Sequence, residues 1–143
     1  MTDILLRYIH FFGILLLGAA LFAENLLLRP VLQQDEVRRL ARIDALYGLA
    51  ALLVLGAGLS LWLIGAKGAA FYSKNPVFHA KLGLFALMGL ASLIPTVFFL
   101  KNRSLPQVNA PASVRLIVRM QLLALPLLPL LAVLMARGIG LEQ

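Results

Sequence analysis

The sequence predicts an all-α integral membrane protein, in which four transmembrane helices pack as an antiparallel up-down-up-down bundle. Of its 143 residues, 62% are hydrophobic and only 13% are charged, whereas soluble domains are about 45–50% apolar and roughly 25% charged. A chain this apolar cannot cover a water-facing surface with polar groups, and it is too hydrophobic to be disordered. It contains four apolar runs long enough to cross a bilayer. Short connections between these runs make sequential helices antiparallel neighbours.

The first predicted span covers residues 4–28 and is ended by Pro30. The run is longer than the hydrophobic region of a cleaved signal peptide, and no A-x-A cleavage motif follows it. We therefore expect it to be retained as a membrane span. Unusually for such a segment, it contains the ionisable residues Arg7, His10 and Glu24.

The second predicted span covers residues 44–64, and we expect residues 29–43 to extend it as a helix at its start. Small residues let helix backbones approach closely in lipid, where burial of apolar surface gives no drive for association. We expect the small residues on this span to serve packing. They are Gly48, Gly56, Gly58 and Ser60.

The third predicted span covers residues 77–100, and the fourth covers residues 114–136. Pro95 lies inside the third span and predicts a kink there. Two prolines interrupt the middle of the fourth span, which transmembrane helices tolerate. Between the two spans, residues 101–113 are expected to form a plain loop.

The lysines and arginines that flank the spans predict the orientation. Eight lie at the end where the first and third spans finish, and five lie at the opposite end. Because cytoplasmic loops are enriched in these residues, we expect a bacterial inner-membrane protein with both termini in the periplasm. The net charge of +7 then reflects contact with anionic lipid headgroups. Nucleic acid is not an expected partner, because no basic face remains outside the spans.

An outer group of ionisable residues contains the two histidines of the chain, His10 and His79. At 1.5 Å per residue, they lie about 9 Å and about 5 Å into the first and third spans. These spans run in the same direction, so both imidazoles reach a similar depth near one membrane face. One axial imidazole from each side holds a b-type haem between helices. His10 and His79 are therefore candidate metal ligands, and hydrogen bonding across helices is their alternative role.

Basic residues near the histidines are candidates to pair with haem propionates. Arg7 lies three positions before His10, and Lys81 lies two positions after His79. Two positions correspond to about 200° around a helix, so Lys81 faces away from the bundle if His79 faces inward. Its long stem can then reach the headgroups. Two further candidates in the preceding connection are Lys67 and Lys74.

Absent residue types limit the other cofactors. The chain has no cysteine, which excludes disulfides, iron–sulfur clusters and thioether-attached haem. It also offers no third ligand beside the two histidines for a closed zinc site, which needs four ligands. A metal or haem held by histidine is not excluded by these absences.

An inner group of charged residues lies toward the opposite membrane face. Glu24 follows His10 by 14 positions, about 40° short of four full turns, so both point to one side of the first span. A buried carboxylate is tolerated mainly when it is paired, and we predict an ion-pair network that staples three helices. A proton path or a clamp for a substrate carboxylate is the alternative role. The network comprises Glu24, Arg42, Asp44, Arg115 and Arg119, with Tyr47 in the same layer.

Three stretches carry a resemblance to known families: residues 8–12 (YIHFF), 46–48 (LYG) and 78–82 (FHAKL). Over nearly the whole chain, the sequence resembles a family of small bacterial four-span inner-membrane proteins with no assigned function. More distantly, it is similar to the HemJ-type protoporphyrinogen oxidase family. That family has a histidine early in the first span and a His-x-Lys element at the start of the third. The positions that match these elements are His10, His79 and Lys81.

The second resemblance implies b haem bound through the histidines and a tetrapyrrole substrate. The HemJ-type first span usually leads to Leu-Pro-Arg, whereas residues 18–24 here end in Glu24, and this difference argues against the same enzymatic activity. One hypothesis is therefore a membrane protein that binds haem b through two histidines. A more specific version of this hypothesis gives the protein oxidoreductase activity. The other is a non-catalytic membrane subunit or assembly protein without a cofactor. Either is compatible with a homo-oligomer, whereas four helices leave little room for the pore of a carrier or channel.

Overall fold

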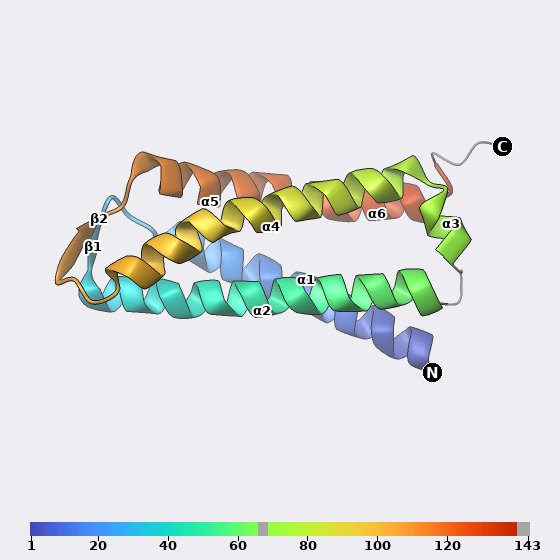
Figure 1. Cartoon of the computed structure of the whole chain (residues 1–143), viewed down its shortest axis with the longest axis horizontal. Coiled ribbons are helices and arrows are strands. Elements are labelled where there is room, and N and C mark those ends of the chain that lie inside the picture. Colours follow the sequence, from blue (N-terminus) through green and yellow to red (C-terminus); the bar gives the residue numbers. More distant parts are fainter. Residues whose placement is uncertain (66–68, 140–143) are drawn as a thin grey trace.

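The structure is a computed structural model that describes residues 1–65 and 69–139. Within these ranges the chain forms six helices and two short strands (Figure 1). Their bounds are α1 (Thr2–Leu27), β1 (Val31–Gln33), α2 (Gln34–Ile64), α3 (Ala69–Ser73), α4 (Pro76–Asn102), β2 (Gln107–Asn109), α5 (Ala112–Ala124) and α6 (Leu127–Ala136).

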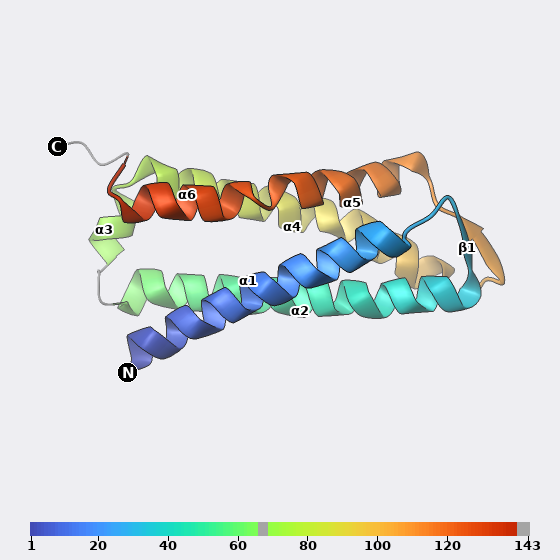
Figure 2. The ribbon, with the colours of Figure 1, turned by 180° about the vertical axis from the view of Figure 1, so that it is seen from behind.

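The predicted four-span helical bundle is confirmed. α1, α2, α4 and the α5–α6 unit over Ala112–Ala136 are each long and apolar enough to cross a membrane. Sequential members run in opposite directions, and the start of α1 and the end of α6 lie at one end of the bundle (Figure 1). α1 runs obliquely along α2 and reaches α5 near its own C-terminal end (Figure 2). The outward surface is rich in exposed large hydrophobic side chains, as expected for a surface that faces lipid.

The two connections at the far end of the bundle differ from expectation. Residues 101–113 do not form a plain loop, because β2 within them pairs antiparallel with β1, and Leu32 lies opposite Val108. The helical extension of the second span begins only at Gln34. In both strands the central residue is buried and its neighbours are exposed. This alternation matches the two-residue period of a strand, but over three residues it is too short to be recognised in a sequence.

The strand pair covers a small apolar cluster at this end of the bundle. The central strand residues contact buried side chains from α2 and α4, and Phe99 of α4 is fully buried among them. Burial of these groups fixes the first and third connections to each other. The cluster consists of Leu32, Val37, Leu40, Phe99, Val108 and Ala110.

Prolines interrupt the two later spans to different degrees. α4 continues through Pro95, which is buried. The fourth span instead divides into α5 and α6 at Pro126, which has no N–H to donate to the preceding turn. Gly138, with φ of 74°, ends α6 in the left-handed conformation. The N–H of Ile139 bonds to the carbonyl of Leu134 there, which is the glycine-terminated helix end that satisfies the last carbonyls.

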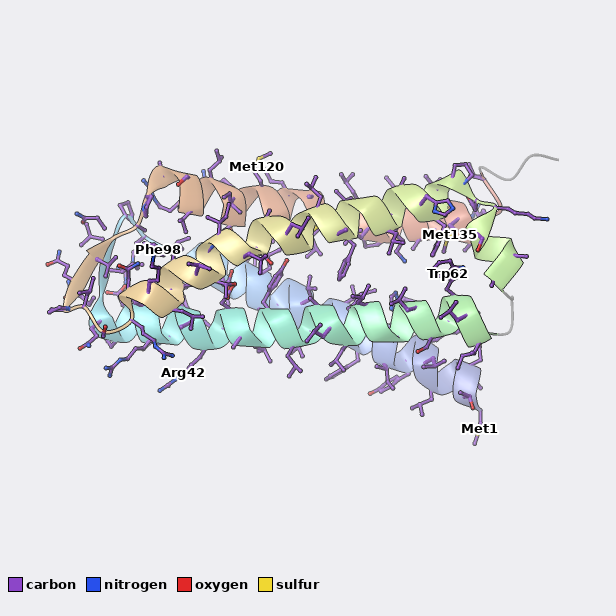
Figure 3. The ribbon with its side chains drawn as sticks, in the orientation of Figure 1. Met1, Arg42, Trp62, Phe98, Met120 and Met135 are labelled. Carbon is purple, nitrogen blue, oxygen red and sulfur yellow. The ribbon has the colours of Figure 1, made fainter. Side chains whose placement is uncertain are left out.

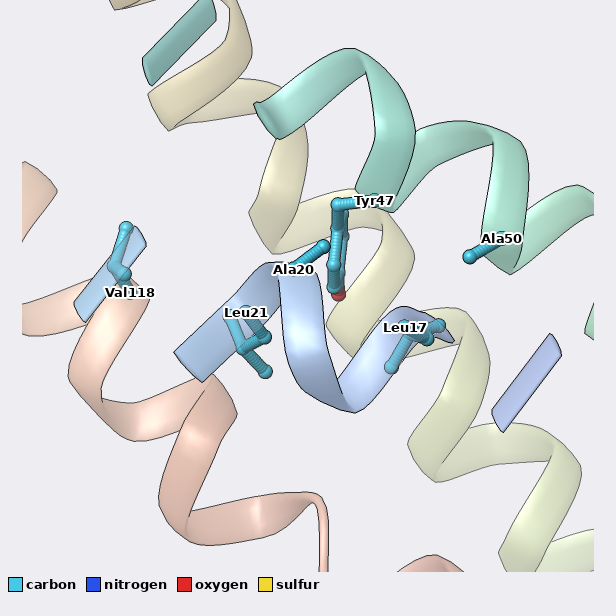
Figure 4. Close-up of a cluster of buried hydrophobic side chains, with 6 residues drawn as sticks. All are labelled: Leu17, Ala20, Leu21, Tyr47, Ala50 and Val118. Carbon is cyan, nitrogen blue, oxygen red and sulfur yellow. The ribbon is translucent and has the colours of Figure 1, made fainter. Parts of the chain in front are cut away.

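The close contact between α1 and α2 forms the centre of the bundle. A Cβ atom on Gly13 would lie 2.9 Å from Cγ2 of Val54, so the two backbones approach at this point. A buried cluster continues along the same seam, where Tyr47 extends from α2 toward α1 (Figure 4). By contrast, a Cβ on Gly48 or Gly56 would meet nothing within 4 Å. The expectation that these two glycines serve close packing is therefore wrong within the chain.

Replacement of Gly13 by alanine should destabilise the bundle. The added methyl group overlaps Val54, and overpacking of a close-packed interior costs about 1–3 kcal/mol. Gly56→Ala is the matched control, because its methyl group meets open space. The free energy of unfolding in mixed micelles measures both changes. Equal stability of the two variants would contradict the close α1–α2 contact.

Candidate functional site

A cavity of about 440 Å³ lies between α1, α2, α4 and α6. This volume is within the range of about 300–1,000 Å³ that is usual for ligand sites. The cavity occupies the half of the bundle that contains the start of α1, α3 and the end of α6 (Figure 1). Its wall is mostly apolar, and its deepest residues include Leu17, Phe85 and Leu125.

The ionisable groups of the described cavity wall all lie in its outer half. They are Arg7, His10 and Lys81. Arg7 forms a 2.7 Å ion pair with Asp3 and is largely exposed. Lys81 is half-buried and has no acidic partner among the residues that the structure describes. The outer half of the cavity therefore carries an excess of positive charge.

The orientation of the His10 ring is set by α2. Its Nδ1 lies 3.0 Å from the carbonyl oxygen of Val54, and a carbonyl can only accept, so Nδ1 carries the hydrogen and donates it. The ring also packs on Gly58, where a Cβ atom would lie 3.2 Å from Cε1. Nε2 of neutral His10 consequently keeps its lone pair for an acceptor or ligand role.

His79 does not line the cavity with His10. Its side chain is exposed, and its Nε2 lies 2.8 Å from the carbonyl oxygen of Ser73. Lys81, which we expected to face away from the bundle only if His79 faced inward, lies on the cavity wall. The structure therefore brings His10 and Lys81 to one cavity and leaves the second histidine at the end of the bundle.

α4 begins at a buried cap and lines the cavity with one of its faces. Asn75 is fully buried and caps the helix, because its Oδ1 accepts a 2.9 Å hydrogen bond from the N–H of Val77. The following side chains face inward at the i, i+3, i+4, i+7 spacing of one helix face. This face comprises Phe78, Lys81, Leu82 and Phe85. The apolar members of this pattern were the signal in the sequence that could have placed Lys81.

An aromatic pair at the outer end of the cavity was missed in the sequence. The rings of Trp62 and Phe78 lie 5.2 Å apart, and Nε1 of Trp62 donates a 2.9 Å hydrogen bond to Oγ of Ser73. Trp62 thus joins α2 to α3 and to the start of α4 (Figure 3). Of the other propionate candidates, Lys74 is exposed and Lys67 lies outside the described residues.

A second polar site lies deeper along the α1–α2 seam. Glu24, Asp44 and Tyr47 are only 1%, 5% and 4% exposed. The buried carboxyl groups of Glu24 and Asp44 lie close enough to interact with each other, and the Tyr47 hydroxyl interacts electrostatically with both. Thr96 of α4, which the sequence reasoning missed, brings its hydroxyl to 2.5 Å from Oδ2 of Asp44.

The predicted arginine partners of these carboxyl groups lie elsewhere. Arg42 and Arg119 are exposed, and Arg42 extends away from the bundle (Figure 3). Arg115 is half-buried, and its Nε has no hydrogen-bond partner among the described residues. In the described part of the chain, none of the three forms an ion pair with either carboxyl group. Arg42 is two positions before Asp44, which places it on nearly the opposite face of α2.

Interhelical amide contacts complete the polar interior. Nδ2 of Asn25 donates to the carbonyl oxygen of Val118 at 3.1 Å, which joins α1 to α5. Nε2 of Gln121 donates to the carbonyl oxygen of Met88 at 3.0 Å, which joins α5 to α4. Such bonds hold helices together in lipid at a typical strength of about 0.6–2 kcal/mol each.

Comparison with known proteins identifies a family but no described activity. Residues 2–140 match the family model described as "Predicted membrane protein (DUF2214)", so the chain belongs to this family. No curated protein and no solved structure matches the chain. The comparisons give no link to the HemJ-type family.

Proposed function

We propose that this DUF2214 protein binds, between its helices, an amphiphile with an anionic headgroup and an apolar tail. One observation carries the proposal: the cavity places basic and imidazole groups in its outer half and apolar side chains in its inner half. A carboxylate or phosphate headgroup matches the first region, and a hydrocarbon tail or ring matches the second. Ligand sites commonly combine an apolar wall with a few polar groups that fix orientation.

Lys81 supplies the energetic reason for an anionic headgroup. An ammonium group away from bulk water is unfavourable unless it is paired, and charged groups inside membrane spans are functional candidates for that reason. Lys81 has no acidic partner in the described part of the chain. A bound anion would supply that partner, while Nε2 of His10 could accept a hydrogen bond from a hydroxyl or protonated acid.

Haem b remains a second candidate for the same cavity, because His10 presents an imidazole nitrogen beside apolar walls. The bis-histidine donor set does not fit this arrangement of helices, since His79 is bonded to the carbonyl of Ser73 outside the cavity. Haem would therefore enter here as one member of the proposed ligand class, an apolar ring with carboxylates. Lys81 and Arg7 would face those carboxylates.

Lys81→Gln should weaken the binding of a fluorescent long-chain fatty acid at least tenfold, which corresponds to about 1.4 kcal/mol. The variant removes the charge that faces the headgroup and keeps most of the side-chain volume. Fluorescence titration of the detergent-purified protein measures the affinity, and the corresponding fatty alcohol tests the role of the anion. Lys74→Gln is the matched control, because Lys74 is exposed outside the cavity. An unchanged affinity in Lys81→Gln would contradict the proposal.

Under our proposal, His79→Gln leaves fatty-acid binding unchanged, since its side chain does not line the cavity.

Absorption spectra distinguish the bis-histidine haem hypothesis from this proposal. Protein purified from haem-replete cells is measured oxidised and then reduced with dithionite. If a Soret band is present, and if His10→Ala and His79→Ala each abolish it, the protein binds haem through both histidines and our proposal is wrong. Stoichiometric co-purification of a larger complex, with neither pigment nor fatty-acid binding, would favour the non-catalytic subunit.

We also propose that the protein lies in a bacterial inner membrane with both termini in the periplasm. The end of the bundle that carries β1 and β2 is rich in arginine and then faces the cytoplasm. This agrees with the excess of lysine and arginine in cytoplasmic loops. Because the chain has no cysteine, single cysteines report each side. In intact spheroplasts, a membrane-impermeant maleimide should label Thr2→Cys, and should label Ser104→Cys only after lysis. The reverse pattern would overturn this orientation.

A further inference from the structure

The buried group formed by Glu24, Asp44, Tyr47 and Thr96 is separate from the cavity, since none of its members lines that wall. It joins α1, α2 and α4 within segments that are apolar enough to span a membrane. Ionisable groups at such positions are functional candidates by default. The hydrogen bonds around Thr96 indicate what this group binds.

The Thr96 hydroxyl can make both of its hydrogen bonds at once only if the neighbouring carboxyl group carries a proton. Its Oγ1 lies 2.5 Å from Oδ2 of Asp44 and 2.9 Å from the carbonyl oxygen of Ser92. The hydroxyl has one hydrogen and the carbonyl can only accept. Both contacts are hydrogen bonds at once only if the Asp44 carboxyl is protonated and donates to Oγ1. With Asp44 ionised, Thr96 donates to Asp44 and loses its bond to Ser92.

Glu24 provides a second, independent observation. Its Oε1 is buried and has no hydrogen-bond partner among the described residues, and the Asp44 carboxyl interacts with the Glu24 side chain. Two carboxylates this close repel strongly in surroundings of low dielectric. A proton on Glu24 removes the repulsion and allows the Glu24 carboxyl to donate a hydrogen bond to Asp44.

The charged and titratable groups around the pair are few. On α1 the group is Glu24 itself, and α2 contributes Asp44 and Tyr47. α4 contributes the Thr96 hydroxyl, which carries no charge. On α5, Arg115 forms no ion pair with either carboxyl group in the described part of the chain. The charge of the pair is therefore governed by protons rather than by a guanidinium.

We propose that Glu24 and Asp44 form an intramembrane proton-binding site that takes up and releases one proton at Asp44. In the form with one proton, Glu24 donates to the Asp44 carboxylate, and Thr96 also donates to it. Uptake of a second proton makes both acids neutral, and Thr96 turns its hydrogen to the Ser92 carbonyl. The result is a continuous chain of donors from Glu24 through Asp44 and Thr96 to Ser92, in which each hydrogen has one acceptor.

Infrared difference spectroscopy of the full chain in lipid bilayers tests the site through the C=O stretch of protonated carboxyl groups. We expect one such band that persists while a second grows reversibly as the pH falls. Glu24→Gln should remove the persistent band, and Asp44→Asn should remove the one that titrates. Glu36→Gln is the matched control, because Glu36 pairs with Arg29 at the start of α2, away from the pair. It should change neither band.

Thr96→Val keeps the test valid if Asp44→Asn does not fold. It removes the hydroxyl and keeps both acids, so the titrating band should shift in frequency and persist. Absence of any protonated carboxyl band at every pH at which the protein is folded would overturn the proposal. So would loss of the titrating band on replacing K⁺ by Na⁺ at constant pH, because the ligand would then be a metal cation.

Discussion

The close approach of α1 and α2 is the interaction on which both polar sites depend. Gly13 allows the backbones to meet at Val54, and the same seam brings His10 against the Val54 carbonyl and Gly58. Further along, it places Glu24 opposite Asp44. In lipid, helices associate through such close packing and through interhelical hydrogen bonds. A wider separation would therefore disturb the cavity wall and the carboxyl pair together.

The two ends of the bundle are built differently. At one end, β1 and β2 join the first and third connections over a buried apolar cluster. At the other end, the short α3 connects α2 to α4, and the cavity lies between the helices. Buried contacts therefore join four chain segments at the strand end, whereas the opposite half of the bundle contains the cavity.

The helical architecture could be predicted because hydropathy and helix length act over whole segments. The sites could be predicted less well, because they depend on rotations that a sequence does not specify. The side chains of His79 and Lys81 point about 200° apart around α4. The composition of the cavity wall therefore depends on which of these two side chains faces inward. Asn75 fixes only where α4 begins, whereas the cavity-facing side of this helix is the one on which Phe78, Leu82 and Phe85 share a face with Lys81. Glu24 was correctly expected to be buried, but its proximity to Asp44, and the contact of Asp44 with Thr96, could not be read from spacing within one helix.

Trp62 has a practical consequence for following ligands. It is the single tryptophan of the chain, it lies on the cavity wall, and its indole N–H is anchored on Ser73. The emission of an indole responds to the polarity and mobility of its surroundings. The protein therefore carries an intrinsic fluorescent reporter in the outer half of its cavity. Occupancy of the cavity can be followed in real time without attaching a label to the protein or to the ligand.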